Sequence, residues 1–180
     1  MLAQRIVTAV VLLALLVPAL AIDVTWPFNV LTLLLIGAAG WEWGRLNQAG
    51  ASLAVAMGLG LALACALAFV AGWSTQSPAV VWPLVAVLWV AGGAWALRGG
   101  PTLWTRVPQM ARWVLGLLAL WAAWLAISHA RSIGINFILS VFCLVWVADI
   151  AAYFGGRRFG RRKLAPTISP GKSREGVYSG

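Results

Sequence analysis

The C-terminal part of the sequence contains a short segment whose residue types suit the binding of phosphate groups. Seven of the 13 basic residues fall between Arg157 and Arg174, interspersed with glycines, prolines and serines. Glycine lets backbone amides approach a phosphate closely, and lysine and arginine form charge-assisted hydrogen bonds with it. This composition predicts a cradle for a phosphorylated ligand.

Carboxylates are scarce, so the position of each one is informative. The four are Asp23, Glu42, Asp149 and Glu175. Asp149 lies in an apolar run, one helical turn before Tyr153, where a buried charge costs about 2 to 3 kcal/mol. A metal ion would compensate this cost, and so would an ion pair with a basic residue of the tail. Glu42 precedes Arg45 by three residues, which predicts an ion pair on one helix.

Two other interpretations of the basic segment compete with the phosphate cradle. The sequence Gly171-Lys172-Ser173 resembles the end of a P-loop, but that motif needs glycine where this chain has Pro166, and a preceding strand. We therefore exclude a P-loop. A polybasic patch that holds acidic lipid headgroups, at about 1 kcal/mol per charge, explains Arg161, Arg162 and Lys163. It explains poorly the compact mixture of turn residues, hydroxyls, cations and a carboxylate in residues 169–176.

The composition of the whole chain indicates which elements position these residues. Hydrophobic residues make up 62% of the 180 positions and charged residues only 9%, against about 25% charged in globular proteins. This excludes a water-soluble fold. The net charge of +9 is concentrated near the C-terminus, which indicates a localised anionic partner such as phosphate groups or acidic lipid.

Six apolar stretches are each close to the length that a membrane-spanning helix needs, about 17 to 25 residues. Such stretches must satisfy their backbone hydrogen bonds internally. We therefore predict an all-α, polytopic membrane protein, with residues 1–153 as the transmembrane region and residues 154–180 as a basic tail. The predicted spans are Ile6–Ile22, Val24–Gly40, Ser52–Gly72, Pro78–Leu97, Ala111–Ser128 and Ile133–Tyr153. In the third, small residues recur every four positions, at Ala54, Gly58, Ala62 and Ala66, a pattern that favours close helix packing.

The distribution of basic residues predicts the orientation. With the N-terminus inside, twelve of the 13 basic residues lie on the inner side and only Arg131 lies outside. This bias predicts that the tail is cytoplasmic, and the bacterial family resemblance described below implies that the membrane is the inner (plasma) membrane. The start also resembles a cleavable signal peptide, because Arg5 and a short apolar run precede Ala19-Leu20-Ala21. Its removal would leave five spans and the same side for the tail.

The run from Asp149 to Gly176, D-I-A-A-Y-F-G-G-R-R-F-G-R-R-K-L-A-P-T-I-S-P-G-K-S-R-E-G, resembles the middle of bacterial phosphatidate cytidylyltransferases, the CDP-diacylglycerol synthases. The match is nearly without gaps. The helices before it resemble the family only in hydropathy and in the cluster Trp41-Glu42-Trp43.

This resemblance implies transfer of cytidylyl from CTP to phosphatidate, giving CDP-diacylglycerol and pyrophosphate for phospholipid biosynthesis. Both reactants are polyanions, so Mg²⁺ and cationic side chains are expected to offset their repulsion. Lys172 and Glu175 would be catalytic, and Asp149 would hold or orient the metal. The implied substrate-binding residues are Arg157, Arg158, Lys163, Ser169, Lys172, Ser173 and Arg174. The expected partners are CTP, phosphatidate and the lipid bilayer, with no nucleic acid; a homodimer is compatible with the sequence.

The family continues past this segment into helices that carry a Lys-Asp pair and a Pro-Gly-His-Gly-Gly-x-x-Asp-Arg type of sequence. Our sequence resembles roughly the first two thirds of it. Because the resemblance assigns metal binding and catalysis to those later acidic residues, we expect residues 1–180 alone not to reach an enzymatic rate. The alternative function is a non-enzymatic membrane protein whose polybasic tail binds anionic lipid.

Overall fold

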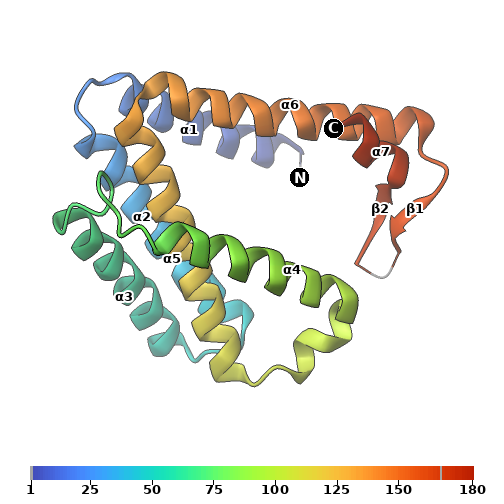
Figure 1. Ribbon diagram of the computed structural model, residues 1–180, viewed down its shortest axis with the longest axis horizontal. Coiled ribbons are helices and arrows are strands. Elements are labelled where there is room, and N and C mark those ends of the chain that lie inside the picture. Colours follow the sequence, from blue (N-terminus) through green and yellow to red (C-terminus); the bar gives the residue numbers. More distant parts are fainter. Residues whose placement is uncertain (1, 167) are drawn as a thin grey trace. The chain divides into compact units, whose positions relative to one another are not determined.

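The computed structural model describes residues 2–166 and 168–180, apart from the side chains of residues 2–6 and 9. The described residues form six helices of at least 20 residues, a two-stranded hairpin and a short last helix (Figure 1). In chain order the elements are α1 (Leu2–Ala21), α2 (Trp26–Leu46), α3 (Ala51–Val70), α4 (Val81–Arg106), α5 (Gln109–Ile133), α6 (Ile135–Phe159), β1 (Lys163–Ala165), β2 (Ser169–Ser173) and α7 (Arg174–Ser179).

Four of the described helices, α3, α4, α5 and α6, are long and apolar enough to cross a membrane. The apolar run of α1, Val10–Ala21, is shorter. The prediction of an all-α, polytopic membrane protein is therefore confirmed, with the hairpin as an addition that the sequence analysis did not foresee. That α1 and α2 also cross the membrane stays a prediction.

Four helices, α2, α4, α5 and α6, end later than the apolar stretches that predicted them, and two of these extensions bear on the sites described below. Helix α2 ends at Leu46 rather than at Gly40, and α6 ends at Phe159 rather than at Tyr153. Both extensions carry arginines in the last turn, where positive charge is favourable at the negative end of the helix dipole. Arginine is also a good helix former. Polarity marks where a helix leaves lipid, and these helices continue beyond that point.

Two glycines interrupt the helices at positions with positive φ. Gly134, with φ of 148°, separates α5 from α6, and Gly100, with φ of 62°, bends α4 just before Pro101. Residues with a side chain rarely adopt such angles, and proline cannot donate the helical hydrogen bond at the next position. The straight part of α4 therefore ends soon after Leu97, the predicted end of that span.

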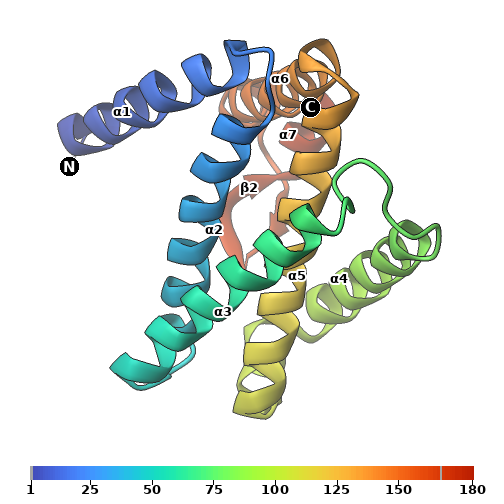
Figure 2. The same ribbon diagram turned by 90° about the vertical axis from the view of Figure 1, so that its left-hand side faces the viewer.

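The chain forms two compact units. The first contains α1, α2, α3 and α5, and the second contains α4, α6, the hairpin and α7. In the first unit α2 packs against α1, α3 and α5 (Figures 1 and 2). A Cβ atom added at Gly58 would lie 3.0 Å from the Trp41 amide nitrogen. The small residue at Gly58 thus lets α2 approach α3 closely, which confirms the predicted packing at this position of the stripe.

Helices α2 and α5 of the first unit are joined by polar contacts. Ser128 Oγ donates to Asn29 Oδ1 at 2.6 Å, and Trp124 Nε1 donates to Thr32 Oγ1 at 3.1 Å. Asn29, Trp124 and Ser128 are each at most 2% exposed. These bonds between buried side chains join α2 to α5.

The predicted ion pair between Glu42 and Arg45 is wrong. Within the described residues these two side chains form none; the Arg45 guanidinium instead lies 5.1 Å from the centre of the Trp41 ring. Trp41 and Arg45 are four residues apart, so their side chains are neighbours on the helix surface. The electron-rich face of the Trp41 ring attracts the cation. Within the described residues Arg45 thus contacts an aromatic ring and no carboxylate.

Candidate functional site

One face of α6 forms the first wall of the candidate site. Asp149, Ala152, Tyr153, Gly156 and Arg157 all line a single pocket. They are spaced three and four residues apart, so they lie on the same side of a helix. Arg157 shares this face with Asp149 only because α6 continues to Phe159.

The hairpin forms the second wall. Strands β1 and β2 are antiparallel, with Lys163 opposite Ser173 and Ala165 opposite Ser169, and the register is irregular between these pairs. The Arg174 N–H donates to the Arg162 carbonyl at 2.9 Å, which closes the open end of the hairpin. Gly171, Lys172 and Ser173 of β2 line the pocket. The segment predicted as a phosphate cradle therefore forms a hairpin that carries Lys172.

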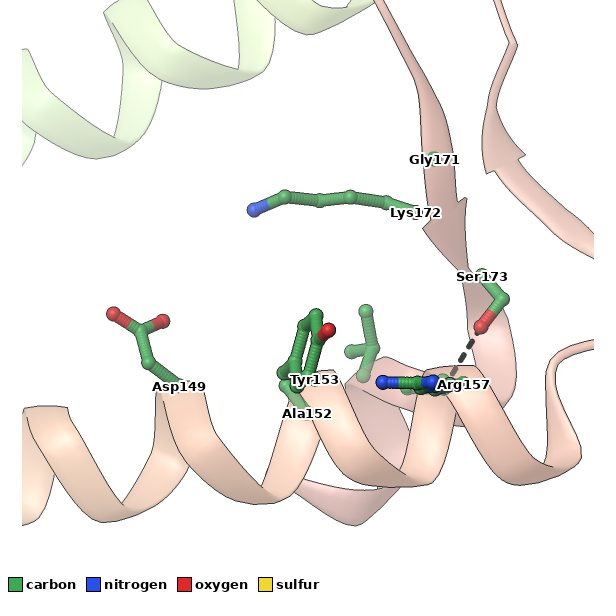
Figure 3. A pocket seen from close by; sticks show the side chains of 10 residues that line it. Asp149, Ala152, Tyr153, Arg157, Gly171, Lys172 and Ser173 are labelled. Atoms are coloured by element: carbon green, nitrogen blue, oxygen red, sulfur yellow. Dashed lines mark hydrogen bonds between the residues drawn. The ribbon is translucent and has the colours of Figure 1, made fainter. Parts of the chain in front are cut away.

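Helix α7 rests directly on α6. A Cβ atom added at Gly176 would lie 2.9 Å from the Ala152 carbonyl oxygen and 3.1 Å from the Gly156 Cα. Glycine is therefore required at this crossing. Ser173 precedes α7 as its N-cap, and its Oγ accepts the Gly176 N–H at 3.2 Å (dashed line in Figure 3). Ser173 is only 7% exposed, so the cap fixes the end of β2 at the base of the pocket.

Glu175 ties α7 to the start of the hairpin. Its carboxylate accepts the Arg161 N–H at 3.1 Å and the Arg162 N–H at 3.2 Å. The pKa of this carboxyl is lowered from its ordinary value, chiefly by a hydrogen bond from its own backbone N–H and then by those of Arg162 and Arg161; burial opposes the shift and the charge of Arg162 adds to it. Each of these donors stabilises the ionised form. Glu175 thus links α7 to the segment that precedes β1 by hydrogen bonds.

The walls enclose a pocket of about 430 Å³. Figure 3 shows Lys172 extending from β2 across the pocket, with Asp149 and Tyr153 pointing from α6 into the same space. The charged residues that line it are two cations, Arg157 and Lys172, and one carboxylate, Asp149. Such a lining suits a ligand with several negative charges.

Asp149 makes no ion pair within the described part of the chain, so the alternative in which a tail arginine neutralises it is not observed. The same residues contain no group of three or more His, Cys, Asp and Glu side chains that could hold a metal ion. Mg²⁺, however, commonly binds through one or two carboxylates together with substrate phosphates and water. Asp149 would fit this more limited role, as a single ligand beside the phosphate groups of a bound substrate.

The structure brings together four of the residues that the sequence analysis nominated: Asp149, Arg157, Lys172 and Ser173 line the pocket. The other nominated residues do not line it, and they are Arg158, Lys163, Ser169, Arg174 and Glu175. Their functional roles stay predictions.

Tyr153 lines the pocket and was not nominated. Its position four residues after Asp149 and four before Arg157 could have identified it, had the helix been extended past residue 153. Gly171 and Gly176 also line the pocket and were treated only as parts of the motif.

Comparison with known proteins adds independent information. Residues 3–180 match the model of the cytidylyltransferase family. A phosphatidate cytidylyltransferase of Pseudomonas aeruginosa is 36% identical over 191 aligned residues, which cover 100% of this chain and 66% of the relative. A phosphatidate cytidylyltransferase of Haemophilus influenzae is 58% identical over 53 residues, which cover 29% of this chain and 18% of the relative.

A Staphylococcus epidermidis phosphatidate cytidylyltransferase is 48% identical over 52 residues, 29% of this chain and 20% of the relative. No solved structure matches the chain. The chain thus spans slightly less than two thirds of the Pseudomonas relative and matches a family model along nearly its whole length. It belongs to the cytidylyltransferase family.

Proposed function

We propose that this chain forms part of a membrane enzyme that transfers cytidylyl from CTP to phosphatidate, giving CDP-diacylglycerol and pyrophosphate. The observation that carries the proposal is the pocket that unites Asp149, Arg157 and Lys172 at the polar end of an apolar helix. A phosphate site at this place meets a water-soluble nucleotide on one side and a lipid headgroup on the other. The names of the relatives support the same reaction.

The chemistry is a substitution at phosphorus. An oxygen of the phosphatidate phosphate forms a bond to the α-phosphorus of CTP, and the bond from that phosphorus to the bridging oxygen of the β-phosphate breaks. Pyrophosphate leaves with the electron pair of the broken bond. Catalysis of this kind depends mainly on positioning and on stabilising negative charge.

Each pocket residue has a role in this scheme that follows from its place. Lys172 extends into the pocket from β2, whose Ser173 end is anchored by the cap of α7, so its ammonium can bind phosphate oxygens there. Arg157 offers a planar pair of donors to a second phosphate. Asp149 would hold Mg²⁺, which supplies charge neutralisation between the two polyanions when bound. Ser173 positions Lys172 through the cap of α7.

The location within the cell belongs to the same proposal. The twelve-to-one distribution of basic residues supports an inner-membrane protein whose pocket faces the cytoplasm, where CTP is available. Arg158, Arg161, Arg162 and Lys163 are exposed and lie outside the pocket, which suits contact with anionic headgroups. A single thiol at Ser169 should resist an impermeant reagent in intact cells; ready labelling would refute this orientation. A homodimer stays a prediction without support from the described residues.

The reaction is tested with a version of the chain extended by the C-terminal third of the Pseudomonas relative. Purified in detergent with labelled CTP, phosphatidate and Mg²⁺, it should produce CDP-diacylglycerol and pyrophosphate in equal amounts. Replacing Asp149 with asparagine should abolish the product. A folded, extended protein that binds CTP but forms no product, or one in which D149N keeps full activity, would refute the proposal.

A further inference from the structure

Helices α2 and α3 pack side by side in the first compact unit (Figure 2). A second hollow lies between them. One part, of about 420 Å³, is lined by apolar and small residues that include Leu34, Gly37, Gly58 and Ala62. An adjoining part, of about 480 Å³, includes Arg45 and Ala51. Trp41 and Val55 line both parts. The two hollows therefore adjoin each other at Trp41 and Val55, and together they are called the groove below.

The groove has an apolar length and a positively charged end. From Leu33 to Arg45 it follows α2 for twelve residues, or about 18 Å at 1.5 Å per residue. One leaflet of a bilayer, half of a hydrocarbon core of about 30 Å, has a similar depth. Leu34 and Leu59 on its walls are 69% and 68% exposed, so the groove faces outward along a membrane-spanning helix.

Two features make the charged end attractive to an anion. Arg45 carries the only formal charge of the described groove lining, and the Trp41 ring holds its guanidinium in place. Ala51 begins α3, whose N-cap, Gly50, has no side chain to accept a hydrogen bond from the first amides. The positive end of the helix dipole adds to the charge of Arg45. Trp41 itself is of the type that prefers the headgroup layer.

We propose that this groove binds an anionic glycerophospholipid, with one acyl chain along α2 and α3 and the headgroup phosphate between Arg45 and the start of α3. Another apolar helix would fill the groove but would leave its cationic end without a partner. A phospholipid supplies both the apolar chain and the negative charge. The groove shares no lining residue with the phosphate pocket of the second unit, and the proposal does not depend on the proposed function.

The experiment is native mass spectrometry of the purified protein titrated with phosphatidylglycerol or with phosphatidylcholine. One basic residue near an anionic headgroup corresponds to about fivefold in affinity, so the anionic lipid should bind about fivefold more tightly. Arg45→Gln should remove this difference. Arg98→Gln, which deletes an equal charge at an exposed site outside the groove, should preserve it.

The apolar part is tested by filling it. Ala38 lines the groove and is exposed, so Ala38→Phe should weaken both lipids severalfold. Ala56→Phe, at an exposed position of α3 outside the groove, should weaken neither. The proposal would be overturned if both lipids bound equally well to the unmodified protein. It would also be overturned if Arg45→Gln and Arg98→Gln changed the lipid selectivity equally, or if Ala38→Phe and Ala56→Phe changed lipid affinity equally. Loss of the selectivity in the version extended by the C-terminal third would overturn it too, because a further helix would then cover the groove.

Discussion

Replacing Gly176 with alanine tests whether α7 must lie directly on α6. The added methyl group would meet the Ala152 carbonyl oxygen at 2.9 Å and the Gly156 Cα at 3.1 Å. Both are backbone atoms of a long helix, so neither can move aside as a side-chain end could. Overpacking of this kind costs about 1 to 3 kcal/mol, and the better helix propensity of alanine recovers about 1 kcal/mol. The docking of α7 should therefore weaken by up to about 2 kcal/mol.

The effect can be followed at the amides that depend on this docking. The N–H groups of Arg161 and Arg162, which closely follow α6, bond to the Glu175 carboxylate of α7, so we expect both bonds to break when α7 moves away from α6. A loss of about 2 kcal/mol corresponds to about 30-fold more of the open state. Hydrogen exchange at these two amides should accelerate by up to that factor.

Gly171 provides the matched control. It lines the same pocket, but a Cβ atom added there would meet nothing within 4 Å. Gly171→Ala should therefore leave exchange at both amides unchanged. Equal exchange rates in the two variants would refute the inference that contact at Gly176 fixes the hairpin.

Two further predictions concern the charges of the second unit. In the extended enzyme, Lys172→Ala should lower kcat/KM about 100- to 1000-fold, the usual cost of losing one transition-state donor. Arg161→Ala, outside the pocket, should lower kcat/KM less than about fivefold. Similar and salt-sensitive losses in both variants would instead indicate non-specific electrostatic attraction. Because the pKa of Glu175 is lowered on folding, its contribution to stability is full above the ordinary carboxyl pKa and is lost as the pH falls through the lowered value. Protection of the Arg161 amide from hydrogen exchange, corrected for intrinsic exchange, should fall as the pH drops through this range. In Glu175→Gln the protection should be independent of pH. If the pH profile of this variant equals that of the unmodified protein, the Glu175 carboxylate does not link α7 to the Arg161 amide.

The membrane helices were largely predictable because a bilayer imposes a simple rule on composition and length. Their ends were not, because a helix does not stop where it leaves lipid. The six residues by which α6 exceeds the predicted span matter for function. They bring Arg157 onto the face of Asp149, and this relation is invisible if the helix is ended at Tyr153.

The hairpin was missed for a different reason. Residues 163–173 contain Pro166, Pro170 and Gly171, which are typical of loops and unfavourable in strands. What orders them is tertiary: Glu175 holds the Arg161 and Arg162 amides, and the Ser173 cap joins β2 to α7. The sequence showed that these residue types suit phosphate. Which of the cations reaches the pocket could not follow from composition, since it depends on the direction that β2 gives to Lys172.

The contents of the pocket lead to a last prediction, about residues 1–180 by themselves. Two cations and one carboxylate can hold the phosphates of a nucleotide, but a single carboxylate binds Mg²⁺ weakly without further ligands. Transfer at phosphorus requires metal and cations arranged together around the developing charge. We therefore expect the 180-residue chain to bind CTP and pyrophosphate, more weakly after Lys172→Ala, and to form no CDP-diacylglycerol.

Binding and turnover separate the two parts of this prediction. Isothermal titration with pyrophosphate measures the first, and labelled CTP with phosphatidate and Mg²⁺ measures the second. The extended version is the positive control for turnover, and Arg161→Ala is the control for binding, since Arg161 has the same charge sign as Lys172 and lies outside the pocket. Product at an enzymatic rate from residues 1–180 would show that these residues contain every catalytic group. If pyrophosphate does not bind, or if Lys172→Ala does not weaken its binding, the space between α6 and β2 is not a phosphate site. The assignment of this site would then be refuted, because both parts of the prediction place the ligand in that space.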